Sequence, residues 1–599
     1  MSIWKYWKHW KKGLPIVASV SALTLVLVGY ISGAAGIKKG HEITPNKKGN
    51  VKDGSIKKIT NFSGPLDNLS NRSAQSKPVE GGSIVLDETR GPKHLDPALA
   101  YDTQSWEVIQ QLNDELVTYK KGTNNTEIKG MDAKSWTISK DQKTYTFHLR
   151  NGLTFWNGQP VTAQNYIDEM ERIATKKLGS DAQWLITNIV GEQAFYNGKA
   201  KTISGLSAPN KNTLVIKLTH PTPTELERLA EPFFSPIDPG FLKKVGHKAF
   251  DSSKVMGDGP FMLQSINSKQ VVLVKNPHYW QKDQYGNQLP YLNKITINID
   301  KNTGVDAANY EQGKTAWLGK QQQIPSSALP KFENTPKLKQ SVQKVVQNAV
   351  YYVGLNNKMA PFNKKAVRQA MEYAINKQAI VQILNGQAVT ANQPLPPNVP
   401  GYETNLPKSI QYNYEPTKAK QLLKQAGVTA SKLHVTLYSQ NSPHQMKIDK
   451  SIQSDLKAIG IDVTLKAMPW SKFLSVVRKG KAQMFFLNWV QDYPDASDFL
   501  MLFKSTQAPD NNSSMYKNTN VDKWLKQARD TSNSQQRIQL FHKVTNQIMQ
   551  DAPWVPVYYP VRYYAVQKWI HGWYAPAYLR DAMQYVWISK GRNTAKNPF

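Results

Sequence analysis

Three aspartates close together are the residues in this sequence whose type and spacing most readily suggest a binding site. Asp492, Asp495 and Asp498 fall within seven residues of a chain with a formal net charge of +32. They follow an apolar segment, and groups just beyond the C-terminal end of a buried strand commonly face the ligand in open α/β sheets. Asp492 lies closest to the strand end. Asp495 and Asp498 have a structural alternative, because either could cap a helix entered at Phe499.

The segment that must position these carboxylates runs from Met484 to Val490. It is short, rich in aromatic residues and free of charged residues, which predicts a buried strand. The strand ends before Asp492-Tyr493-Pro494-Asp495, where the proline favours a turn.

The remaining elements predict a mixed α/β protein. Alternating strands and helices before Met484 indicate an α/β lobe, with strands at 433–438 and 462–466 and a helix at 446–459. We expect further strands at 144–149, 214–218, 271–274, 295–299 and 555–559, and helices at 105–119, 163–174, 363–385 and 416–427.

Composition excludes several classes of protein. A chain of 599 residues should split into two or more lobes, and the absence of cysteine excludes disulfides, thiolate metal sites and cysteine nucleophiles. The 11 histidines lack metal-binding spacing, and no G-x-S-x-G nucleophile motif occurs. We therefore expect no metal, no cofactor and no enzymatic activity.

Two further patterns bear on nucleotides and nucleic acids. Ala308–Thr315 satisfies a relaxed phosphate-loop pattern, but the helical segment precedes Gly313 instead of following it, so we expect no nucleotide site. The 76 Lys and Arg residues against 44 Asp and Glu predict attraction to polyanions. Because the lysines are spread over the chain instead of clustering with aromatic residues, we expect anionic cell-wall polymers as partners and no nucleic acid.

The N-terminal residues predict export from the cytoplasm. Met1–Lys12 carries four lysines among three tryptophans, and Gly13–Ile37 contains no charged residue. These features are typical of a signal or membrane-anchor segment over 1–36. Ser32-Gly33-Ala34 resembles a cleavage site, so cleavage is an alternative to the retained anchor that we favour. Residues 37–78 are predicted to form a disordered basic tether.

Several motifs in order resemble the extracytoplasmic solute-binding proteins of family 5, typified by the oligopeptide- and dipeptide-binding components of ATP-driven (ABC) importers. Leu95-Asp96-Pro97-Ala98 is similar to the opening motif of the family. The segment Asn151–Ala163 resembles its most diagnostic sequence, and Gly257–Phe261 resembles the next. Trp489-Val490-Gln491-Asp492-Tyr493 matches the Trp-x-x-Asp-Tyr segment of peptide-binding members.

This resemblance implies a two-lobed periplasmic-binding-protein-like fold of type II, with an extra subdomain in the first lobe and the ligand cleft between the lobes. The first lobe would span 79–344 and the second 345–563, and 564–599 would return to the first lobe. The protein would be extracytoplasmic, at the outer face of the cytoplasmic membrane of a bacterium. Its partners would be short peptides, together with a permease and ATPase subunits on other chains.

The resemblance also implies roles for individual residues. In peptide-binding members the aspartate that corresponds to Asp492 receives the peptide's α-ammonium, and Tyr493 belongs to the same segment. Trp489 would form an apolar wall, with a plain core position as the alternative. The segment Asp87–Lys93 is implied to face the same cleft, which makes Thr89 and Arg90 candidate binding residues.

Three functions therefore remain in competition. The first is a receptor for peptide import, and the second is a receptor of the same family for a metal chelate, a sugar or another cation. The third is a basic cell-surface adhesin, which would bind polyanions in a strongly salt-dependent way.

Overall fold

The computed structural model describes residues 77–122, 126–300, 303–319, 324–325, 327–575 and 582–589. The chain divides into two units, Met1–Lys58 and Ile59–Phe599, and every described residue belongs to the second unit. The expected signal or anchor at 1–36 and nearly all of the expected tether therefore lie outside the described residues. Among the residues that are described, no helix has the length and apolar character needed to span a bilayer.

One four-stranded sheet contains the first strand of the described chain. Its order is β1-β10-β9-β8, with β1 parallel to β10 and the other pairs antiparallel. The strands are β1 Ser83–Glu88, β8 Phe261–Asn267, β9 Gln270–Lys275 and β10 Lys294–Ile299. Side chains of β1 and of helix α2 (Thr103–Leu112) share an apolar core with residues near the C-terminus, among them Tyr564, Trp573 and Val586.

A second four-stranded sheet is wholly antiparallel, in the order β4-β5-β7-β6. Its strands are β4 Ala133–Ile138, β5 Thr144–Leu149, β6 Leu206–Asn210 and β7 Thr213–Lys217. In β5 every second residue is buried, so Tyr145, Phe147 and Leu149 face the core. Helix α3 (Ala163–Ile173) contacts β6 and β7 and begins with a capping box formed by Thr162 and Asn165. We refer to these two sheets and their helices as the first lobe.

Short elements lie between these strands along the chain. They comprise strands β2 Val117–Tyr119 and β3 Ile128–Gly130, α-helices α4 Glu192–Tyr196, α5 Glu225–Leu229, α6 Pro239–Val245 and α7 His247–Phe250, and 3-10 helices η1 Gln183–Ile186 and η2 Pro232–Phe234. They are followed by α8 Thr303–Glu311, β11 Trp317–Leu318, α9 Leu329–Asn334 and α10 Pro336–Lys339.

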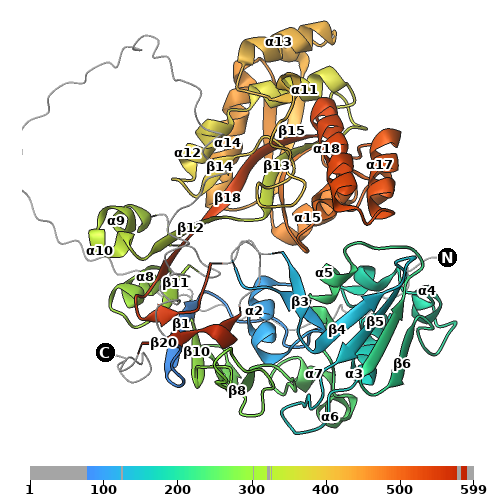
Figure 1. Ribbon diagram of the computed structural model, residues 1–599. Coiled ribbons are helices and arrows are strands. Elements are labelled where there is room, and N and C mark those ends of the chain that lie inside the picture. Colours follow the sequence, from blue (N-terminus) through green and yellow to red (C-terminus); the bar gives the residue numbers. More distant parts are fainter. Residues whose placement is uncertain are drawn as a thin grey trace, which may run out of the picture. The chain divides into compact units, whose positions relative to one another are not determined.

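An eight-stranded mixed sheet forms the second lobe. Its main order is β11-β18-β13-β17-β15-β16, and β12 and β14 also pair with β18. The strands not yet defined are β12 Val342–Val346, β13 Ala349–Leu355, β14 Ala388–Thr390, β15 His434–Gln440, β16 Asp462–Met468, β17 Met484–Val490 and β18 Trp554–Val566. The first half of β18 pairs with β13 and its second half with β12 and β11 (Figure 1). Strand β18 thus links β12 and β11 to the rest of the sheet.

Helices cover both faces of this sheet. The cluster that contains Val353, Phe486 and Val555 packs against α11 Lys365–Ala374, α12 Lys377–Ile383, α13 Pro416–Gln425 and α14 Pro443–Ala458. The cluster that contains Phe485 and Trp554 packs against α15 Trp470–Arg478, α16 Ala496–Leu500, α17 Thr519–Arg529 and α18 Ser534–Asp551. Figure 1 shows α17 and α18 side by side, in agreement with their extensive contacts. Consecutive residues of β17 therefore enter opposite cores.

The remaining elements are short. They comprise 3-10 helices η3 Lys408–Ile410, η4 Ala430–Lys432, η5 Met501–Phe503, η6 Ser505–Gln507 and η7 Met583–Tyr585, and the strand pair β19 Ile570–His571 and β20 Trp587–Ile588.

Three predicted elements need correction. The helix expected over 105–119 ends at Leu112, because Asn113 is extended and the backbone amide of Asp114 donates to the Asp258 carboxylate. The helix expected over 363–385 is two helices, since Asn376 caps the second one. The late strand is longer than the expected 555–559, because aromatic and β-branched residues continue to Val566 and pair with β12.

Candidate functional site

Strand β17 places Asp492 just beyond its C-terminal end, as the sequence predicts. The strand is antiparallel to β13 and parallel to β15, and its bounds match the predicted segment. After the strand, the amide of Gln491 donates to the Asn348 carbonyl, and the Asn348 side chain donates to the Gln491 side chain at 3.0 Å. These bonds hold the turn that contains Asp492 against the short link between β12 and β13.

Asp492 contacts the first lobe through a tyrosine. The hydroxyl of Tyr101, from the segment before α2, donates to Asp492 Oδ2 at 3.2 Å. The Tyr101 ring packs against Trp106 and Phe233, and the side chain is 37% exposed. Removal of water from Asp492 raises the pKa of its carboxyl to about 7. A partly accessible carboxyl that still holds a proton near neutral pH is suited to exchange that proton for a cationic group.

Asp498 lies directly behind Asp492 and is fully buried. One carboxylate oxygen accepts hydrogen bonds from the Trp489 indole at 3.0 Å and from the Asp492 backbone amide at 3.1 Å. The other oxygen, Oδ1, is buried without a hydrogen-bond partner. Burial and the adjacent Asp492 charge raise the pKa of Asp498 well above its ordinary range. Ionisation of these two neighbouring carboxyls is unfavourable, so a positive charge that approaches them is favoured because it stabilises their ionised form.

The structure separates the two helix-capping candidates. Asp495 caps α16 by accepting from the amide of Ser497, and it forms an ion pair with Arg537 at 2.9 Å. The helix begins at Ala496, earlier than the expected Phe499. Asp498 lies inside the helix and caps nothing, because its carboxylate turns back toward Trp489 and Asp492. The capping interpretation therefore holds for Asp495 and is wrong for Asp498.

The other predicted site residues fall into two groups. Trp489 is partly buried against the apolar cluster of the second lobe, and the Tyr493 ring is buried with its hydroxyl 3.3 Å from Ser497 Oγ. Both lie beside Asp492. Thr89 and Arg90 occupy the bend after β1, and neither is among the described residues that hydrogen-bond Asp492 or line the pocket beside it. Their binding role stays a prediction.

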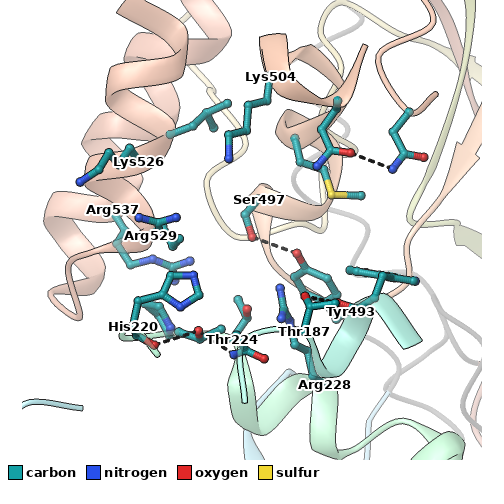
Figure 2. A pocket seen from close by; sticks show the side chains of 18 of the residues that line it. Thr187, His220, Thr224, Arg228, Tyr493, Ser497, Lys504, Lys526, Arg529 and Arg537 are labelled. Carbon is teal, nitrogen blue, oxygen red and sulfur yellow. Dashed lines mark hydrogen bonds between the residues drawn. The ribbon is translucent and has the colours of Figure 1, made fainter. Parts of the chain in front are cut away.

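A pocket of about 350 Å³ opens beside Tyr493, between residues of both lobes. We call it the basic pocket, because five of its lining side chains are cationic and none is acidic: Arg228, Lys504, Lys526, Arg529 and Arg537. Figure 2 shows Lys504, Lys526, Arg529 and Arg537 on the second-lobe side, facing His220, Thr224 and Arg228 of the first lobe. The volume is within the usual range for small-ligand sites.

Several of these residues carried no signal in the sequence. Tyr101 and Asp492 are separated by 391 positions, and Arg228 and Lys504 come from segments with no common pattern. The acidic cluster included Asp498, but its position in the sequence favoured helix capping. Within the described residues, no group of three or more His, Asp or Glu side chains is arranged to hold a metal ion.

The chain is similar to bacterial binding proteins over most of its length. The family model for bacterial extracellular solute-binding proteins, family 5, matches residues 127–511. Identity is 29% over 499 residues to the probable D,D-dipeptide-binding periplasmic protein DdpA of Escherichia coli strain K12, with 82% of this chain and 90% of that protein covered. Identity is 26% over 531 residues to heme-binding protein A of Haemophilus influenzae, with 86% and 94% covered.

A solved structure extends the similarity to the fold. The ABC transporter-associated periplasmic binding protein DppA from Helicobacter pylori, in complex with the peptide STSA, superposes with a TM-score of 0.71. It is 26% identical in sequence, and the match covers 86% of this chain and 100% of that chain.

Proposed function

Because the chain belongs to the bacterial extracellular solute-binding proteins of family 5, we propose that it is the receptor of an ABC importer and captures short peptides through their free amino terminus. The observation that carries the proposal is the contact of Asp492 with Tyr101 across the two lobes, with Asp498 buried behind it. A solute-binding role follows from the family, and the peptide ligand is the part that we add. No catalytic step is assigned to the chain.

The chemistry of capture follows from the two carboxyls. A peptide α-ammonium that replaces the Tyr101 hydroxyl at Asp492 forms a charge-assisted hydrogen bond in a site from which water is largely removed. Such a bond requires a free amino terminus and is indifferent to side chains. When residues of both lobes bind one ligand, the closed arrangement of the lobes is favoured, because only that arrangement makes both sets of contacts. The closed receptor would then dock on a permease formed by other chains.

Calorimetric titration tests this proposal by measuring the number of protons that are released when a peptide binds. We expect a free-amine tripeptide to bind and to release up to about one proton near pH 6.5, because an adjacent ammonium lowers the pKa of the Asp492 carboxyl from about 7. Affinity should rise with pH up to about 7 and fall again above about 8, where the peptide amine loses its proton. Binding heats measured in two buffers of different ionisation enthalpy give the number of protons released.

Two results would contradict this expectation. Absence of binding heat in both buffers would contradict a peptide ligand. Equal heats in both buffers at pH 6.5 would contradict the assignment of Asp492 as the group that releases the proton. A triglycine with a free amine is a suitable first ligand, since it has no titratable side chain of its own.

A non-peptide solute is the second candidate, because heme-binding protein A is a relative of comparable similarity. A heme or another chelate would bind without a free amine, so its binding should survive the substitution Asp492→Asn. The N-terminal membrane anchor and the attraction of the basic tether to anionic cell-wall polymers are further proposals, and the sequence alone supports them.

A further inference from the structure

The five cations of the basic pocket are only partly paired with carboxylates, all of which lie outside its lining. Arg537 pairs with Asp495 at 2.9 Å, and Lys526 and Arg529 share Asp530 at 2.7 and 2.8 Å. Among the described residues, no carboxylate lies within ion-pair distance of the two remaining cations, Arg228 and Lys504. Arg228 interacts with the buried Glu225 carboxyl only from beyond ion-pair distance, and Lys504 has no carboxylate partner among the described residues.

Arg228 is the strongest indication that a partner is missing. Its Nε atom is buried without a hydrogen-bond partner, and its nearest bond is a long one of 3.4 Å from Nη1 to the Leu185 carbonyl. The guanidinium lies over the rings of Trp184 and Tyr493, 5.8 and 5.7 Å from their centroids. A buried donor on a charged group is costly unless an acceptor reaches it, and a carboxylate matches the donor geometry of guanidinium.

The pocket adjoins the proposed ammonium site. Tyr493 follows Asp492 directly in the chain, and Trp184, which lines the pocket, lies near the Tyr101 hydroxyl. One residue of extended peptide spans roughly 3.3 Å, so a group in the pocket belongs to the first few residues of a ligand anchored at Asp492. Figure 2 shows Lys504 extending into the space between the lobes, on the side opposite Arg228.

We propose that the basic pocket binds a carboxylate of the same ligand, so that the receptor prefers peptides with an acidic group close to their amino terminus. The inference rests on the proposed peptide function and specifies its substrate class. The carboxylate is that of a glutamate or aspartate side chain, and the C-terminus of a short peptide is the competing source that the test separates. Burial and the nearby Arg529 hold the pKa of His220 below its ordinary value, so this lining residue is neutral and does not add to the charge.

A general excess of surface lysine is the alternative explanation, since the whole chain carries +32. Exposed lysines on a basic surface need no ligand. The pocket differs from such a surface because its lining includes no carboxylate and because one arginine donor is buried and unpaired.

The test measures peptide preference in the full-length protein and its variants. The ligands are tripeptide amides of alanine in which one glutamate or one glutamine is moved through the three positions, together with trialanine as the free acid and as the amide. We expect a glutamate at one position to tighten binding about tenfold or more relative to glutamine. If the C-terminus is the source of the carboxylate, trialanine acid should instead exceed its amide by a similar factor.

Substitutions in the pocket should remove this preference. We expect Lys504→Gln and Arg228→Gln each to bring the ratio of dissociation constants closer to one, and Lys504→Glu to favour lysine-containing peptides instead. Lys450→Gln is the matched control, because Lys450 is exposed on α14 in the same lobe. Thermal unfolding without ligand shows whether each variant is folded.

The outcomes separate the two proposals. If all the peptides bind and no glutamate peptide is preferred over its glutamine counterpart, or if the preference survives both Lys504→Gln and Lys504→Glu in folded protein, the pocket inference is overturned while the peptide function stands. If no peptide binds, the peptide function itself fails. A preference that is lost in the Lys504 variants and retained in Lys450→Gln supports the inference.

Discussion

The substitution Asp492→Asn should weaken binding of free-amine peptides by roughly 30-fold or more, since truncation of one partner of a desolvated charge pair costs about 2–5 kcal/mol. Asparagine keeps the shape of the side chain and can still meet the Tyr101 hydroxyl, but it offers no negative charge to an ammonium. Calorimetric titration of the wild-type and variant proteins with the same triglycine at pH 7.5 measures the loss.

This substitution should not weaken the fold. Asp492 and Asp498 are neighbouring carboxyls, and each makes ionisation of the other less favourable. Removing the Asp492 charge should therefore leave the unfolding midpoint unchanged or raise it at pH 8, where both groups would otherwise tend to ionise. Asp510→Asn is the control for a same-lobe aspartate, because Asp510 is exposed and its pair with Arg478 measures 3.6 Å. Equal binding by wild type and Asp492→Asn would show that the ammonium is bound elsewhere.

Arg172→Met should lower the free energy of unfolding by about 3–5 kcal/mol, because it leaves buried carboxylates without their partner. Arg172 donates to both oxygens of Asp96 and both oxygens of Glu169, and the two carboxylates are 0% and 1% exposed. Burial raises the pKa of Glu169 to about 7, so that residue can take up a proton. This network joins the segment before α2, which carries Tyr101, to helix α3.

Urea unfolding measures the effect as a shift of the transition that includes the first lobe. Arg478→Met provides the matched control, since the Arg478 pair is exposed on both sides and such pairs contribute about 0–1 kcal/mol. If the free energy of unfolding falls no more in Arg172→Met than in Arg478→Met, the buried network does not stabilise the fold as we expect.

Local pattern was enough to predict the strands that hold the site. Met484–Val490 and Thr144–Leu149 match β17 and β5, because the first is an uncharged, largely apolar run and the second alternates polar and apolar residues. The end of α2 could not be predicted, because Leu116 continues the helical spacing. Only the distant Asp258, which accepts a hydrogen bond from the amide of Asp114, shows that the chain has left the helical path.

The candidate site was predictable only on one side. Asp492 follows a recognisable strand, so its place at the strand end could be predicted from the sequence. Tyr101, Arg228 and Lys504 reach the same region from separate parts of the fold, and no periodicity within the chain relates them. Asp498 shows a different limit, since an aspartate near a helix start has a ready structural explanation. Its buried contacts with Trp489 and Asp492 distinguish it.

Thermal unfolding with a peptide and its N-acetylated counterpart tests the central claim most directly. At about a hundredfold excess over the dissociation constant, the free-amine peptide should stabilise the native protein by roughly 2.7 kcal/mol and raise the unfolding midpoint. The N-acetylated peptide has the same side chains without the ammonium, so the account predicts no shift with it. Equal shifts with both peptides, or a shift with neither, would contradict capture of a free amino terminus at Asp492.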